Sequence, residues 1–274
     1  MKNAIIYTFV FLGFQVMAGF IVDGIWRWAF GKNAMNDATG IIVTTVVFTV
    51  ISIAVFLLAK WCEVSRHWIR TRPWVTLIWC VVAALGAIIP SVWIQEHMPE
   101  LPNIAEDTFD MIMKDRWGYL AVGLLAPLGE EMVFRGAVLR SLLQWCSKPW
   151  VAIAISALIF AAAHMNPAQL PHAFLIGLLL GWLYYRTDSI VPGMVYHWIN
   201  NSVAYIMYNL YPSADLTLGN AAQAPWDIWE DPRGAYVKAQ EELADTVNVL
   251  TTIQAENVSD TIQSLAKEKS TYLE

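Results

Sequence analysis

The sequence predicts an all-α, polytopic membrane protein: a transmembrane helical bundle of about seven spans, followed by a C-terminal extramembrane helical tail. Of its 274 residues, 57% are hydrophobic and only 15% are charged, well below the roughly 25% charged residues of soluble domains. The mean hydropathy is +0.46. At 1.5 Å per helical residue, a span of about 30 Å of hydrocarbon needs about 20 apolar residues. Stretches near that length lie at 4–26, 40–60, 74–94, 117–143, 150–165, 169–186 and 190–210.

Composition divides the chain into three parts. Residues 1–100 hold N-terminal transmembrane helices without a recognised motif, and residues 117–210 hold every intramembrane polar position discussed below. Residues 211–274 carry eleven acidic and four basic residues, a net charge of −7, and are expected to form the tail. Because no basic stripe exists to meet a phosphate backbone, we expect no nucleic-acid partner.

Two adjacent acids, Glu130 and Glu131, interrupt a stretch that otherwise resembles a membrane-spanning helix. An acidic side chain at that depth costs about 2.5–3.5 kcal/mol on insertion scales, so it indicates a functional site unless it has a structural partner. Glu131 has one in Arg135, four residues later on the same helical face. Glu130 lies about 100° around the helix from that face and has no cation nearby in sequence. Glu130 is therefore the candidate for chemistry.

Three further polar residues lie in apolar stretches: His164, His197 and Asn201. Each is costly in a membrane unless it meets a polar partner. The spacing of four puts His197 and Asn201 on one helical face. One intramembrane histidine more often bridges helices than catalyses. Two histidines, one asparagine and one glutamate from three helices instead predict a single shared cavity.

This set of side chains is suited to peptide hydrolysis. A carboxylate beside an imidazole, here Glu130 and His164, can take a proton from water and deliver it to a leaving amine. A second imidazole and an amide, His197 and Asn201, can donate hydrogen bonds to an oxyanion. The same residues allow an alternative in which Glu130, His164 and His197 bind Zn²⁺. The sequence leaves open whether the protein needs zinc or no metal.

The order and spacing of these residues resemble the CPBP family of CAAX proteases and bacteriocin-processing enzymes, also called the type II CAAX prenyl endopeptidase or Abi family. The family's motifs E-E-x-x-x-R, F-x-x-x-H and H-x-x-x-N correspond here to Glu130, Glu131 and Arg135, to Phe160 and His164, and to His197 and Asn201. A further run from Phe174 to Ile190 is similar to a family segment that contains Gly177 and Gly181. We interpret these two glycines as helix-packing residues. Asp188 replaces the usual glycine at a position where Asp tolerates turn geometry.

The resemblance implies that Glu130 activates water with His164, that His197 and Asn201 hold the oxyanion, and that Glu131, Arg135 and Phe160 support the site. The expected protein is an intramembrane endopeptidase of the bacterial inner membrane. Its expected partners are the lipid bilayer and a membrane-embedded or lipid-linked peptide substrate, of CAAX or bacteriocin type. The alternative is a non-catalytic membrane binding or immunity protein that uses the same helical scaffold.

Overall fold

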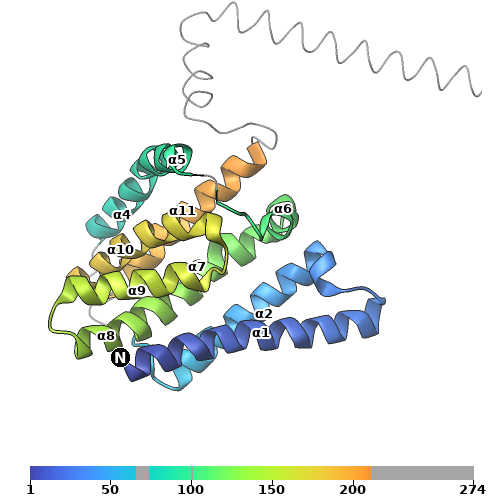
Figure 1. Ribbon diagram of the computed structural model, residues 1–274, viewed down its shortest axis with the longest axis horizontal. Coiled ribbons are helices and arrows are strands. Elements are labelled where there is room, and N and C mark those ends of the chain that lie inside the picture. The colour runs from blue at the N-terminus through green and yellow to red at the C-terminus, as the bar shows by residue number, and fades with distance from the viewer. Residues whose placement is uncertain (66–73, 100, 211–274) are drawn as a thin grey trace, which may run out of the picture. The chain divides into compact units, whose positions relative to one another are not determined.

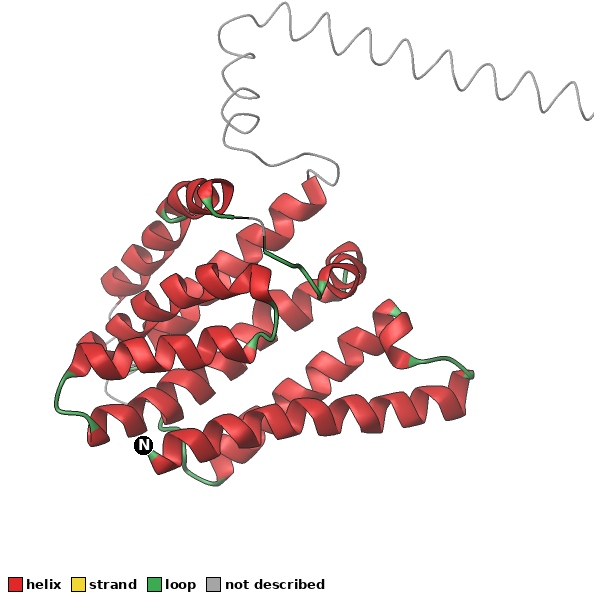
Figure 2. Cartoon of the chain, viewed as in Figure 1, coloured by secondary structure: helices red, strands yellow, loops and turns green. Residues whose placement is uncertain are grey.

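The computed structural model of the protein describes residues 1–65, 74–99 and 101–210, and these are helices joined by loops, without strands (Figures 1 and 2). The all-α class predicted from the sequence is confirmed. The α-helices are α1 (Lys2–Phe30), α2 (Ala38–Leu58), α4 (Trp74–Gly86), α5 (Ile88–His97), α6 (Glu106–Lys114), α7 (Ala126–Glu130), α8 (Arg140–Trp145), α9 (Pro149–Ala163), α10 (Leu170–Thr187) and α11 (Val191–Leu210). The predicted tail at 211–274 lies outside the described residues.

Every apolar stretch expected from the sequence contains helix. In the described chain, three helical segments are long and apolar enough to cross a membrane, namely Lys2–Phe30, Ala38–Leu58 and Trp74–Ile94. Most of their side chains are not buried inside the protein, and large apolar residues such as Phe20 and Trp28 are exposed. Such exposed apolar faces are stable against lipid rather than water. The chain is therefore an integral membrane protein.

The helices α1 and α2 form an antiparallel pair that lies lengthwise side by side (Figure 1). Gly31 ends α1 in the left-handed conformation, at φ 66°, which costs glycine little. Asp37 then begins α2, where its carboxylate accepts a hydrogen bond from the backbone N–H of Gly40 at 3.1 Å. The indole of Trp26 donates to the same carboxylate at 3.2 Å, which ties the end of α1 to the start of α2.

The central helical stretch runs from Tyr119 to Trp145 and contains the two adjacent glutamates. Two of its segments, Tyr119–Leu125 and Glu131–Leu139, have the wider π-helical turn and lie on either side of α7. All residues of Glu131–Leu139 are buried. Because π-helical turns occur mostly at functional sites, this segment is the first structural indication of where the site lies.

The helices α9 and α10 lie side by side through small residues (Figure 1). A Cβ atom on Gly177 would lie 3.0 Å from the Cα atom of Ala157, and one on Gly181 would lie 2.9 Å from Ile153 Cγ2. These contacts agree with the packing role expected for the two glycines. Asp188 ends α10 in the left-handed conformation, at φ 49°, as expected of a turn residue that replaces glycine.

The helix α6 lies between the apolar stretches 74–94 and 117–143, where the sequence predicts no membrane span. Its apolar residues Phe109, Ile112 and Met113 recur at helical spacing and line a cavity, whereas its other face is charged. On that outer face Lys114 donates a hydrogen bond to Asp110 at 2.7 Å and lowers the pKa of this carboxyl. The three acids of this short helix, Glu106, Asp107 and Asp110, mask its amphipathic pattern in the sequence.

Candidate functional site

A cavity of about 480 Å³ lies among α1, α2, α6, the central helical stretch and α9–α11. Glu130, His164, His197 and Asn201, which the sequence predicted to share a cavity, all line it. They come from three parts of the chain, at the ends of α7 and α9 and in the middle of α11. The remaining wall is mostly apolar, with a few further polar side chains such as Thr44 and Thr108.

Glu131 lies beneath the cavity wall and holds a buried hydrogen-bonded network. Its Oε1 accepts from Arg135 Nη1 at 2.7 Å and from His197 Nδ1 at 3.1 Å. Glu131 and Arg135 are 0% and 1% exposed. The guanidinium of Arg135 also donates to the backbone carbonyl of Gly177 at 3.4 Å and lies 4.2 Å from the ring centroid of Phe160. The ion pair expected between Glu131 and Arg135 is present and joins the central helix to α9, α10 and α11.

The side chain of Glu130 differs from that of Glu131 in its exposure and in its hydrogen bonding. Its side chain is 21% exposed and lines the cavity, and its Oε2 lies 3.8 Å from His197 Nε2, beyond hydrogen-bond distance. Within the described chain it makes no hydrogen bond. Of the two adjacent carboxylates, Glu131 is therefore buried and bonded through Oε1 to Arg135 and His197, whereas Glu130 lines the cavity, where it can meet a ligand.

His164 lies at the C-terminal end of α9. Its Nδ1 is 2.9 Å from the backbone carbonyl of Phe160. Since a carbonyl oxygen can only accept, Nδ1 carries the hydrogen, and Nε2 of the neutral ring is then free to act as a base or acceptor. Phe160 contacts both cavity histidines edge-on, with ring centroids 4.8 Å from that of His164 and 5.9 Å from that of His197.

The amide of Asn201 is held in a fixed orientation. Its Nδ2 donates to the backbone carbonyl of Val122 at 2.9 Å, and its Oδ1 accepts from Asn200 at 3.3 Å. One N–H of the amide remains after the bond to Val122. Asn200, which we expected to point away from the site, also lines the cavity.

Residues 113–203 match the family model described as "Rce1-like: Type II CAAX prenyl endopeptidase Rce1-like". Over this segment the chain is similar to that family. The match begins in α6 and ends in α11, so it contains every polar residue of the cavity named above. It agrees with the resemblance to CPBP intramembrane proteases seen in the sequence.

One curated relative of the chain is an Escherichia coli protein described as an uncharacterized 24.3 kDa protein. It is 29% identical over 152 residues, a match that covers 49% of this chain and 68% of that protein. No solved structure matches the chain significantly.

A zinc site would need its donor atoms within about 2.0–2.2 Å of one point. Among the residues that the structure describes, no three His, Cys, Asp or Glu side chains cluster closely enough to hold a metal ion. Glu130, His164 and His197 as placed do not fit zinc, and we derive no step through a metal.

His172 is a cavity residue that none of the sequence motifs includes. This residue lies in the first turn of α10 and lines the same cavity as His164 and His197. In the described part of the chain, neither of its ring nitrogens hydrogen-bonds to protein. No short spacing motif connects His172 to the other polar residues, so the sequence contained no local signal for it.

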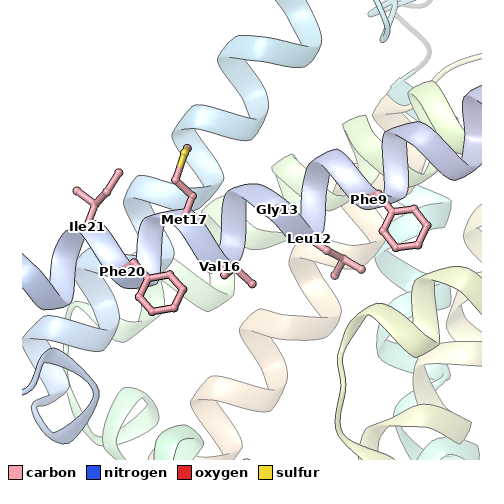
Figure 3. Close-up of a pocket in the computed structure, with 7 residues that line it drawn as sticks. All are labelled: Phe9, Leu12, Gly13, Val16, Met17, Phe20 and Ile21. Atoms are coloured by element: carbon pink, nitrogen blue, oxygen red, sulfur yellow. The ribbon is translucent and has the colours of Figure 1, made fainter.

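A second concavity lies on α1, far from this chemistry. It is lined by apolar residues of one helix, including Phe9, Val16 and Phe20, with Gly13 at its centre (Figure 3). It contains no ionisable side chain and faces away from the protein core. We interpret it as part of the lipid-exposed surface of α1.

Proposed function

We propose that the protein is an intramembrane endopeptidase that hydrolyses a peptide bond of a membrane-embedded or lipid-linked substrate. The Rce1-like family supports a protease of the CAAX type in general. The observation that most favours this reaction is the set of four polar side chains from three helices around one cavity, where the carboxylate of Glu130 accepts no hydrogen bond from the described chain.

In the proposed reaction Glu130 takes a proton from a water molecule in the cavity. The resulting hydroxide attacks the substrate carbonyl carbon, and the carbonyl π electrons move to its oxygen. His164 assists through Nε2, because its Nδ1 hydrogen is held by Phe160. The proton then passes to the leaving amine as the C–N bond breaks. Glu131 cannot replace Glu130, since its Oε1 is shared by Arg135 and His197.

His197 and Asn201 are proposed to stabilise the oxyanion. Because Nδ1 of His197 donates to Glu131, the ring can donate to an oxyanion only from Nε2, which requires the imidazolium form. The free N–H of Asn201 supplies the second donor.

The walls of the cavity favour an apolar substrate. Phe11, Phe48, Phe109 and Ile112 line it from α1, α2 and α6, and no lysine or arginine lines it in the described chain. We propose a CAAX-like or bacteriocin-type substrate that is lipid-linked or embedded in the bilayer. We further propose that the protein resides in the inner membrane of a bacterium, where such substrates are accessible.

The test is cleavage of a lipidated, membrane-anchored peptide by the purified full chain in liposomes. Wild type and Glu130→Gln are compared, with Glu106→Gln as a control because Glu106 is exposed on α6 and does not line the cavity. We expect Glu130→Gln alone to lose cleavage, and cleavage by wild type to survive a chelator. Equal cleavage by wild type and Glu130→Gln would contradict the role of Glu130. Loss in chelator would favour the zinc alternative.

A non-catalytic immunity or binding protein is the competing function. It predicts that wild type cleaves no member of a panel of prenylated, acylated and leader-type peptides. It also predicts that Glu130→Gln retains the biological effect of the protein. The enzyme hypothesis predicts the opposite for both measurements.

A further inference from the structure

Glu131 Oε2 is the only buried side-chain oxygen or nitrogen in the described chain that lacks a hydrogen-bond partner. Its neighbour on α11 is a glycine. A Cβ atom placed on Gly193 would lie 2.6 Å from Oε2 and 3.4 Å from Cδ of Glu131. The first of these distances is far below a van der Waals contact. The carboxylate of Glu131 thus lies where a side chain at position 193 would be.

Gly193 is unusual among the glycines that the structure describes. Elsewhere an added Cβ would meet backbone, an uncharged side chain or open space, but at Gly193 it would meet a charged group. Gly193 also precedes His197 by four residues, so the two face the same side of α11. One turn of α11 therefore leaves room for the carboxylate, and the next turn hydrogen-bonds to it.

We propose that Gly193 is a positioning residue, whose lack of a side chain lets Glu131 lie against α11 and orient the ring of His197. The inference rests on the proposed function only for its effect on catalysis, because the contact between Glu131 and His197 can be observed without a substrate.

A methyl group at position 193 cannot be accommodated unless its surroundings shift. Glu131 and Gly193 are both buried, and Arg135 holds Oε1 of the carboxylate from the opposite side. The carboxylate must rotate or α11 must move outward, and either change lengthens the 3.1 Å bond from His197 Nδ1. The ring then loses the partner that fixes its orientation. A misplacement of about 1 Å at a catalytic group can cost on the order of 10²-fold in rate.

Gly181 provides a matched control. It is also a buried helix glycine, and its Cβ would lie 2.9 Å from Ile153 Cγ2, a somewhat longer contact that is also shorter than van der Waals distance, but with an apolar side chain. Gly181→Ala therefore disturbs packing without touching the charged network. Gly193→Ala disturbs both.

The experiment records ring ¹⁵N–¹H spectra of the full chain in detergent, with ¹⁵N-histidine labelling and with His197→Gln to assign the His197 signals. We expect wild type and Gly181→Ala to show the Nδ1 proton of His197 as a deshielded, hydrogen-bonded resonance, and folded Gly193→Ala to lose it. Retention of this resonance in folded Gly193→Ala would overturn the proposal. Because no substrate is used, this result is independent of whether the proposed peptidase activity exists.

A second variant covers the case in which Gly193→Ala does not fold. Glu131→Asp shortens the acid by one methylene and withdraws the carboxylate from α11. If the clash is with Glu131, the double variant Glu131→Asp/Gly193→Ala recovers folded protein relative to Gly193→Ala alone. If the double variant is as poorly folded as Gly193→Ala, the clash lies elsewhere and the proposal fails. Where a cleavable peptide is available, we expect Gly193→Ala to lower kcat on the order of 10²-fold, with Gly181→Ala close to wild type.

Discussion

His197 donates its Nδ1 hydrogen to Oε1 of Glu131 across 3.1 Å, although the two residues are 66 positions apart in the chain. The bond fixes which nitrogen of the ring faces the buried network and which faces the cavity. The second nitrogen, Nε2, lies 3.8 Å from Glu130. His197 thus lies between the buried Glu131 and Glu130 in the cavity wall. The different roles proposed for the two glutamates depend on this position.

Arg135 is predicted to be essential for stability. Arg135→Leu leaves the Glu131 carboxylate buried and short of a partner, so we expect the free energy of unfolding to fall by about 3–5 kcal/mol. Lys114→Leu removes an ion pair of similar length, 2.7 Å, but an exposed one, and should change stability little. Equilibrium unfolding in detergent checks both. Equal losses in the two variants would show that burial of the Glu131 pair has no energetic consequence.

Asn201→Ala is predicted to lower kcat about 10²–10³-fold with little change in KM, as expected for loss of an oxyanion donor. Asn209→Ala is the matched control. Asn209 lies on the same helix and also donates to a backbone carbonyl, that of Met113 at 2.9 Å, but it does not line the cavity. Steady-state kinetics on the lipidated peptide separate the two. A similar fall in kcat for both variants would indicate that Asn201 acts through helix packing.

The sequence predicts those contacts of the site that form within one helix, but not those between distant segments. Helical spacing was enough to place Glu131 beside Arg135 and to put His197 and Asn201 on one face. The hydrogen bond from His197 to Glu131 was not predictable from spacing, because it forms between distant segments that only packing brings together. The sequence therefore identified the residues but not their pairing.

The same limit explains what was missed. His172 belongs to no spacing motif, and only the packing of α10 places it on the cavity wall. Gly193 has no chemistry of its own, and its importance appears only when the distance to Glu131 is measured. The helix α6 was missed because its charged outer face hid the apolar residues that line the cavity.

His172 is predicted to bind substrate rather than to catalyse. Its ring has no protein hydrogen bond in the described chain and lines the cavity, so it can donate to or accept from a peptide group. We expect His172→Ala to raise KM by up to about tenfold, the value of one neutral hydrogen bond, with a smaller change in kcat. His97→Ala is the control, since His97 is exposed and hydrogen-bonds to Trp93. If kcat falls and KM does not, His172 takes part in the chemical step.

The central claim is that Glu130 activates water rather than attacking the peptide itself. The most direct measurement is a single turnover in H₂¹⁸O, with enzyme in excess over the lipidated peptide, followed by mass spectrometry of the product and of the peptide containing Glu130. We predict that the new carboxylate of the product contains one ¹⁸O after the first turnover and that Glu130 contains none. A first-turnover product without ¹⁸O would show that the oxygen came from a carboxylate of the enzyme, which contradicts the role assigned to Glu130.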